Sequence, residues 1–256
     1  MLNELMRLRG RAVALAFAIA TSAMMPATDL QATPPRVDRL TPDLRLTERD
    51  VAASNEKVKM AYADLAALWR DRFGELGGRF AVPRLLRYRG ATRTACGVMQ
   101  PSNAAYCPST NSIYYDEVFV AAQAKAASSE LGSDGDMAGI GVIAHEMGHA
   151  VAIQLGYASP VAYDNESVAD CLAGAFARHA DENGSLEPGD VEEAFFGMAA
   201  AADPTPELTG NRRVDRRILA RAAVMGHGTR EQRMGNFRAG LNGGAGACVA
   251  DFEGRR

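Results

Sequence analysis

Two histidines four residues apart, His145 and His149, lie in an apolar stretch of predicted helix together with Glu146. Side chains at positions i and i+4 stand one above the other on a helix face, so both imidazoles can reach one metal ion. Glu146 projects toward the same cleft, where a carboxylate can take a proton from a metal-activated water. A pattern of five residues also occurs by chance, so the interpretation depends on the next element of the chain.

That second element begins at Asn165 and places Glu166 and Asp170 on one face of the next predicted helix. Glu166 can complete a site of two histidines and one carboxylate, with the fourth position left to water, as in catalytic zinc centres. Asp170 can accept the remaining ring N–H of a ligand histidine. A lone acid near a helix start can also be a solvated residue favoured by the helix dipole. The two elements together predict a zinc site.

The combination resembles the thermolysin-like zinc peptidases and, more closely, the bacterial neutral zinc metallopeptidase family. The segments that carry the resemblance are Cys96-Gly97, Tyr106-Cys107-Pro108, Ile113 to Asp116, His145 to His149, Glu166 to Cys171, and His227 to Arg233. The resemblance implies a zincin-like fold, a bound Zn²⁺ and a protease that acts on peptides or proteins. The Arg- and Ala-rich segment from Pro204 to Gly226 departs from the family pattern.

His227 is a further catalytic candidate, in a Gly-His-Gly setting just before a predicted helix. A histidine held there could donate a hydrogen bond to the oxyanion that forms as water adds to a carbonyl. Arg233 is the substitute donor if His227 lies too far away. His227 can equally be a loop residue with no part in catalysis, because the sequence does not place it beside the metal.

Residues 111 to 116 are rich in β-branched and aromatic side chains and predict a strand. We expect this strand to be the sheet edge along which an extended peptide substrate lies. Tyr114 or Tyr115 would then face the cleft, since side chains alternate between the two faces of a strand. Packing of both tyrosines within the fold is an equally good interpretation.

The four cysteines predict two disulfides in an oxidising compartment. Cys96 and Cys107 enclose a loop rich in glycine, proline and serine, which a disulfide would staple. Cys171 and Cys248 then pair by elimination. One alternative is four free thiols, and another is that Cys96 and Cys107 bind a metal. Two cysteines without a second close pair or a nearby histidine make a poor structural zinc site, so the disulfides are favoured.

Residues 1–23 have the layout of a signal peptide, because three arginines precede the uncharged run from Ala12 to Ala23. That run is short for a bilayer span, which takes about 20 residues. An amphipathic N-terminal helix is the alternative. Residues 24–45 contain four prolines and predict a linker. We therefore expect an exported chain, periplasmic or secreted, with a membrane tether only if the leader is not cleaved.

Residues 46–256 are expected to form one α+β, predominantly helical domain. An amphipathic helix is predicted from Thr47, with polar Asn55 interrupting its apolar stripe. Short strands and loops are predicted over residues 80 to 120. Further helices are predicted over Met137 to Leu155, Glu166 to Ala180, Pro188 to Ala201, and from Thr229, where Thr229 and Gln232 form a capping-box pattern.

The composition is that of an ordinary globular protein of 256 residues, with 47% hydrophobic and 23% charged residues. The net charge of −3 gives no indication of a nucleic acid or an anionic surface as partner. The favoured function is a zinc endopeptidase with Glu146 as general base. The alternative is an exported, zinc-containing protein that holds peptides without hydrolysing them, although binding alone does not require Glu146. A third interpretation is a structural protein that is held by disulfides and binds no metal. It would require that both the two-histidine pattern at His145 to His149 and the acidic pattern at Glu166 to Asp170 occur by chance.

Overall fold

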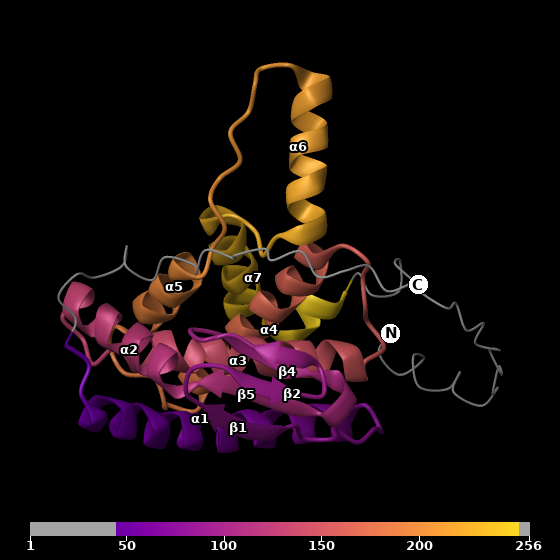
Figure 1. Ribbon diagram of the computed structural model, residues 1–256. Coiled ribbons are helices and arrows are strands. Elements are labelled where there is room, and N and C mark those ends of the chain that lie inside the picture. Colours follow the sequence, from indigo (N-terminus) through magenta and orange to yellow (C-terminus); the bar gives the residue numbers. More distant parts are fainter. Residues whose placement is uncertain (1–44, 251–256) are drawn as a thin grey trace.

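The computed structural model describes residues 45–250, so the predicted signal peptide and nearly all of the predicted linker lie outside the described residues. The described chain is an α+β fold in which helices predominate, as predicted (Figure 1). Its helices are α1 (Glu48–Glu75), α2 (Glu117–Leu131), α3 (Asp136–Gln154), α4 (Ala162–Glu182), α5 (Asp190–Ala200), α6 (Arg212–Met225) and α7 (Arg230–Val249). Its strands are β1 (Arg84–Tyr88), β2 (Thr92–Thr94), β3 (Gly97–Met99), β4 (Ala104–Cys107) and β5 (Ser112–Asp116).

Helix α1 begins where the sequence predicted, with Thr47 as N-cap in a complete capping box. Its apolar stripe is buried, and polar Asn55 lies buried within it. Asn55 accepts a hydrogen bond from the Tyr115 hydroxyl at 3.0 Å and donates one to Glu117 at 2.6 Å. The interruption of the stripe therefore joins α1 to the end of β5 and the start of α2.

The larger sheet has the strand order β1-β5-β4, with β1 parallel and β4 antiparallel to β5. The expectation that residues 111 to 116 form an edge strand is wrong, because β1 pairs along the side of β5 that β4 does not cover. The edge strand beside α3 is β4. Tyr115 is buried and bonded to Asn55, so it does not face a cleft. Strands β2 and β3 form a separate hairpin.

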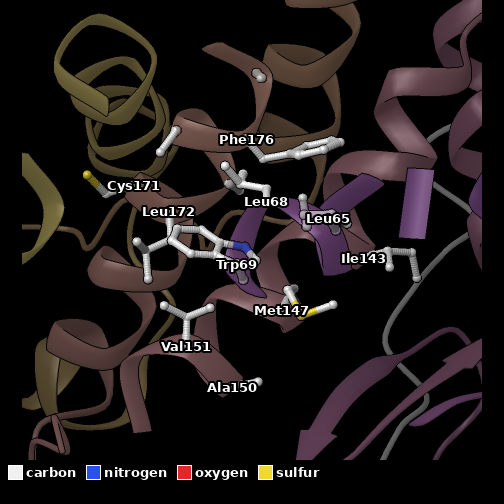
Figure 2. Packing of buried hydrophobic residues seen from close by; sticks show 14 of the residues in the cluster. Leu65, Leu68, Trp69, Ile143, Met147, Ala150, Val151, Cys171, Leu172 and Phe176 are labelled. Carbon is white, nitrogen blue, oxygen red and sulfur yellow. The ribbon is translucent and has the colours of Figure 1, made fainter. Parts of the chain in front are cut away.

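Helix α3 is buried on most of its circumference. Four of its apolar side chains share one face and pack with α1 and α4. Figure 2 shows this cluster, formed by Ile143, Met147, Ala150 and Val151 of α3 with Leu65, Leu68 and Trp69 of α1 and Leu172 and Phe176 of α4. Each of these side chains is less than 9% exposed. Burial of this face fixes the rotation of α3 about its axis, and hence the direction of the side chains between the core positions.

Close approach of α3, α4 and α7 depends on three glycines. A Cβ at Gly148 would lie 2.8 Å from the carbonyl oxygen of Ala169 in α4. A Cβ at Gly174 or Gly240 would lie 1.9 Å or 1.7 Å from a backbone oxygen of the partner helix. These contacts are possible only without a side chain, so Gly148 sets the spacing between the two helices that carry the zinc motif.

The N-terminus of α3 is capped from a distance. Its N-cap residue, Gly135, has no side chain to bond the free N–H groups. The buried carboxylate of Glu193 in α5 accepts from the N–H of Gly135 at 2.8 Å and of Met137 at 2.9 Å. Helix α5 therefore anchors the start of α3.

Two helices start at other residues than predicted, and a third was not predicted. Helix α4 starts at Ala162, ahead of Glu166, because the Asn165 side chain bonds the backbone of Ser159 and closes the preceding turn. Helix α5 starts at Asp190 after Gly189 in a left-handed conformation, so Pro188 lies outside it. Helix α6 was not predicted. Figure 1 shows it standing away from the body of the fold.

Both predicted disulfides are present, Cys96–Cys107 and Cys171–Cys248. The first joins the β2–β3 hairpin to the end of β4, and the second joins α4 to the end of α7. Between residues 45 and 250, none of the helices combines the length and apolar character required to traverse a bilayer.

Candidate metal centre

His145 and His149 lie on the side of α3 that faces α4. Their rings are 4.7 Å apart between centroids and nearly perpendicular, at 86°. The side chains of His145 and His149 are 9% and 19% exposed. The i, i+4 spacing thus brings both imidazoles to one point, as predicted.

Glu166 of α4 completes this group. One carboxylate oxygen lies 3.1 Å from His145 Nε2, and the other lies 3.4 Å from His149 Nε2. Two atoms that each bind a tetrahedral zinc ion at about 2.0–2.2 Å lie about 3.4 Å apart. Oε2 of Glu166 is buried and accepts no well-aligned hydrogen bond from the described residues. Two imidazoles, one carboxylate and an unsatisfied buried oxygen are a donor set that fits zinc.

Asp170 lies on the other side of the His145 ring, where Oδ1 is 2.8 Å from Nδ1. This contact orients the ring so that Nε2 faces Glu166. Arg233 of α7 binds the same carboxylate with two nitrogens, Nη2 at 2.6 Å and Nε at 3.1 Å. Both Asp170 and Arg233 are buried. The sequence had offered Arg233 only as a substitute oxyanion donor.

The charges of these groups are strongly coupled. Burial opposes protonation of His145, but the carboxylates of Asp170 and Glu166 outweigh it and raise the pKa of the imidazole to about 10. Burial would raise the pKa of Glu166 and of Asp170. For Glu166 the two histidines outweigh burial and hold its pKa far below the ordinary value. For Asp170, His145 and Arg233 outweigh burial and lower the pKa. In the metal-free site, a proton shared between His145 and Glu166 is therefore favoured.

Glu146 lies beside this group and is 7% exposed. Its Oε2 accepts a hydrogen bond from the backbone N–H of Tyr106 at 2.7 Å. Among the described residues no hydrogen bond reaches its other oxygen, Oε1. The edge strand β4 thus holds the carboxylate by one oxygen, a contact that no pattern in the sequence predicts.

His227 lies at the base of the α6 segment and does not join the group of His145, His149 and Glu166. Its side chain is 60% exposed, and Nδ1 lies 3.5 Å from Asp203 Oδ1. Asp203 also accepts hydrogen bonds from the backbone N–H groups of His227 and Gly228. Arg233 is engaged by Asp170 and by the carbonyl of Ala201. His227 contacts none of the three residues, whereas Arg233 Nη2 lies 3.3 Å from His145 Nδ1, the ring nitrogen that faces away from Glu166.

Four acidic residues form a second group whose oxygens could approach one cation: Asp134, Asp136, Asp190 and Glu193. Lys57 already bridges Asp134 and Asp136, and Glu193 caps α3. Burial, together with the nearby acids Asp136, Glu193 and Asp134, raises the pKa of Asp190 to about 6. These contacts give the four acidic residues a structural role, because they anchor the start of α3.

Comparison with known proteins decides the family. The chain matches the family described as "Putative neutral zinc metallopeptidase" over residues 11–252. It belongs to this family. The neutral zinc metallopeptidases are by description zinc proteins, so membership implies Zn²⁺ as the cofactor.

Two curated relatives are similar to this member of the family. Each is an "Uncharacterized protein YpfJ", one from Escherichia coli strain K12 and one from strain O6:H1 (CFT073). Each is 32% identical over 192 residues, which is 69% of this chain. The chain spans 63% of the length of these relatives. No solved structure matches it.

Proposed function

We propose that this protein is a zinc-dependent endopeptidase whose metal is bound by His145, His149 and Glu166, with Glu146 as general base. The observation that carries the proposal is the convergence of three ligand atoms within 4.8 Å of one another beside a carboxylate held by a backbone N–H. Family membership supports the zinc and the reaction class.

A bound zinc ion supplies Lewis-acid polarisation of a water molecule and of the scissile carbonyl. The proton chemistry belongs to Glu146. Its Oε1 is available to take a proton from the attacking water and to deliver it to the leaving amine. The N–H of Tyr106 bonds Oε2 and so fixes the plane of the carboxylate. Asp170 and Arg233 hold the His145 ring in the tautomer that presents Nε2 to the metal.

An extended peptide substrate would pair with the free edge of β4. Strand β4 is covered by β5 on one side only. The Tyr106 N–H, which reaches Glu146, points away from β5. The open side of β4 therefore runs beside the general base. Strand β4 thus takes the place of residues 111 to 116 as the proposed substrate-binding strand, because those residues are central in the sheet.

Export to the periplasm or the medium is part of the proposal. Two disulfides support an oxidising compartment. The signal-peptide layout of residues 1–23 supports it as well. The short loop closed by Cys96 and Cys107 lies next to β4, so reduction would loosen the substrate edge.

The alternative function is a zinc protein that binds peptides at the same edge without cleaving them. Such a protein would need the ligands and β4, but it would have no use for a buried carboxylate next to the metal. Glu146 and its bond to Tyr106 therefore favour hydrolysis.

The experiment is a zinc assay of the purified protein and of three variants, His145→Ala, His149→Ala and Glu166→Ala, with cleavage of a broad peptide library. Each variant should lose zinc, because a site of two ligands is open to water. His179→Ala is the matched control, since His179 lies away from the group and contacts Asp64. One zinc per chain after two ligand changes would refute the site. Zinc without cleavage by the wild type would favour the alternative.

A further inference from the structure

The segment from Leu208 to Met225, here called the α6 arm, is built unlike the rest of the molecule. Helix α6 has no buried residue. Of the ten large apolar side chains that are exposed among the described residues, five lie on this arm: Leu208, Val214, Leu219, Val224 and Met225. Figure 1 shows the arm standing clear of the body. Exposed apolar side chains gathered on one projecting element are typical of an interaction surface.

The charge of the arm is opposite to that of the remaining chain. Helix α6 carries one acid, Asp215, and five arginines, Arg212, Arg213, Arg216, Arg217 and Arg221. It therefore has a net charge of +4, whereas the whole chain carries −3. The rest of the chain therefore carries a net charge of −7. The low net charge of the sequence conceals this separation.

The outer end of the arm is rigid. Asn211 caps α6 by accepting from the N–H groups of Arg213 and Val214. Asp215 accepts two hydrogen bonds from Thr209, one from its backbone and one from its hydroxyl, both at 2.8 Å. The one acid of the helix is thus engaged in the turn. Leu208 and Val214 flank this turn and are 54% and 41% exposed.

We propose that the outer end of the α6 arm binds the surface of an anionic lipid bilayer. Exposed aliphatic side chains among arginines are the composition of helices that bind such surfaces, because the apolar groups enter the interface and the cations meet lipid phosphates. An arm-to-arm contact with a second copy of this chain would be opposed by the like charges; contact of the arm with the acidic body of a second copy is an outcome that the test separates from lipid binding.

The length of the arm fits this role. A helix of 14 residues is about 21 Å long, since each residue adds about 1.5 Å. The Debye length at physiological salt is about 8 Å. The acidic body is thereby held more than two Debye lengths from the lipid charges, while the arginines at the outer end of α6 reach them.

The test is co-sedimentation of the full, zinc-loaded chain with vesicles of phosphatidylglycerol and phosphatidylcholine, compared with phosphatidylcholine alone. Binding should require the anionic lipid and should weaken as salt rises. Arg216→Gln with Arg217→Gln should reduce partitioning about 25-fold, because each basic residue at such a surface contributes about fivefold. Arg79→Gln with Arg93→Gln is the matched control, because both arginines are exposed elsewhere, and it should bind like the wild type.

A reporter locates the contact. The chain has one tryptophan, Trp69, which is buried. Leu208→Trp therefore adds an indole whose emission should shift to the blue with anionic vesicles. No change in that emission, or equal binding by the Arg216/Arg217 variant and the wild type, would overturn the proposal; equal binding would assign any membrane contact to another segment. A dimer that the same substitutions dissociate, without vesicle binding, would overturn it in favour of a second copy.

Discussion

The guanidinium of Arg233 grips the carboxylate of Asp170 with two nitrogens, at 2.6 and 3.1 Å, on the side away from the predicted metal. Oδ1 of Asp170 also faces His145 Nδ1 at 2.8 Å. Nη2 of Arg233 itself lies 3.3 Å from His145 Nδ1. Helix α7 therefore contacts the proposed metal site both directly and through Asp170 of α4, although it supplies none of the three proposed ligands. Arg233 is a positioning residue.

Arg233→Lys should lower zinc affinity about 10- to 100-fold, the usual effect of losing a partner behind a ligand. Lysine keeps the charge but cannot reproduce the planar two-nitrogen contact. Chelator competition measures the affinity, and the melting temperature of the zinc-free protein separates it from a general loss of stability. Arg230→Lys is the control, because Arg230 is exposed on the same helix; it should change neither the zinc affinity nor the melting temperature. Equal zinc affinity of the two variants would show that Arg233 does not position the site.

Zinc binding should become stronger as pH rises. In the zinc-free protein the pKa of His145 is raised to about 10 from 6.5. Below that value a proton occupies the imidazole and zinc must displace it, so affinity should rise about tenfold per pH unit between pH 7 and 9. Calorimetry in buffers of different ionisation enthalpy should show about one proton released. A flat affinity over this range would contradict the coupling.

The same shifts set the stability of the zinc-free protein. The raised pKa of His145 gives stability that is complete below its ordinary value of 6.5 and is lost as pH rises toward about 10. The lowered pKa of Glu166 gives stability that is complete above its ordinary value of 4.5 and is lost as pH falls. The gain in melting temperature on adding zinc should therefore be larger at pH 9 than at pH 6.

Gly148→Ala should destabilise the fold by about 1–3 kcal/mol, as overpacking does, and should weaken zinc binding. The new methyl would meet the Ala169 carbonyl oxygen at 2.8 Å and push α4, which carries Glu166, away from α3. Gly141→Ala on the same helix is the control. Its methyl would lie 3.7 Å from Met198, so alanine should be neutral or stabilising there. Equal behaviour of the two variants in denaturation and zinc titration would contradict this packing.

Loss of the Cys171–Cys248 bridge should cost more than loss of Cys96–Cys107. The first closes a separation of 77 residues and the second one of 11, which correspond to about 4–5 and about 3 kcal/mol in the chain-entropy account. Cys171 also follows Asp170, so the double alanine variant at 171 and 248 should bind zinc less tightly. Urea titration and chelator competition on both double variants check this; the opposite order would refute it.

The group of His145, His149 and Glu166 could be predicted from the sequence because its geometry is local. The spacing of His145 and His149 fixes a shared helix face, and Glu166 follows on the next helix. The role of Arg233 could not be predicted, because it depends on how α7 packs on α4. That contact arises from Gly174 and Gly240, whose close approach has no signature at the sequence level.

The sheet was harder to predict for the same reason. A strand at residues 112 to 116 is evident from composition, but its neighbours are not, since the parallel pairing with β1 is non-local. In the sequence, Asn55 only interrupts the apolar stripe of α1. The fold explains this residue, because it brings the hydroxyl of Tyr115 to the Asn55 side chain as a hydrogen-bond donor. Helix α6 buries none of its residues, so it does not belong to the core-facing pattern from which the other helices were predicted, although its apolar and charged side chains follow a helical period. Its cap at Asn211 was the available signal.

The most direct test of the account is the turnover of Glu146→Gln at matched zinc content, with Glu130→Gln, at an exposed position, as control. Glutamine is nearly the size of glutamate and can still bond the Tyr106 N–H, but it cannot accept the proton of the attacking water. The account predicts unchanged zinc binding and melting temperature, with peptide hydrolysis reduced by about 10²- to 10⁴-fold. Equal turnover by Glu146→Gln and the wild type would show that Glu146 is not the base.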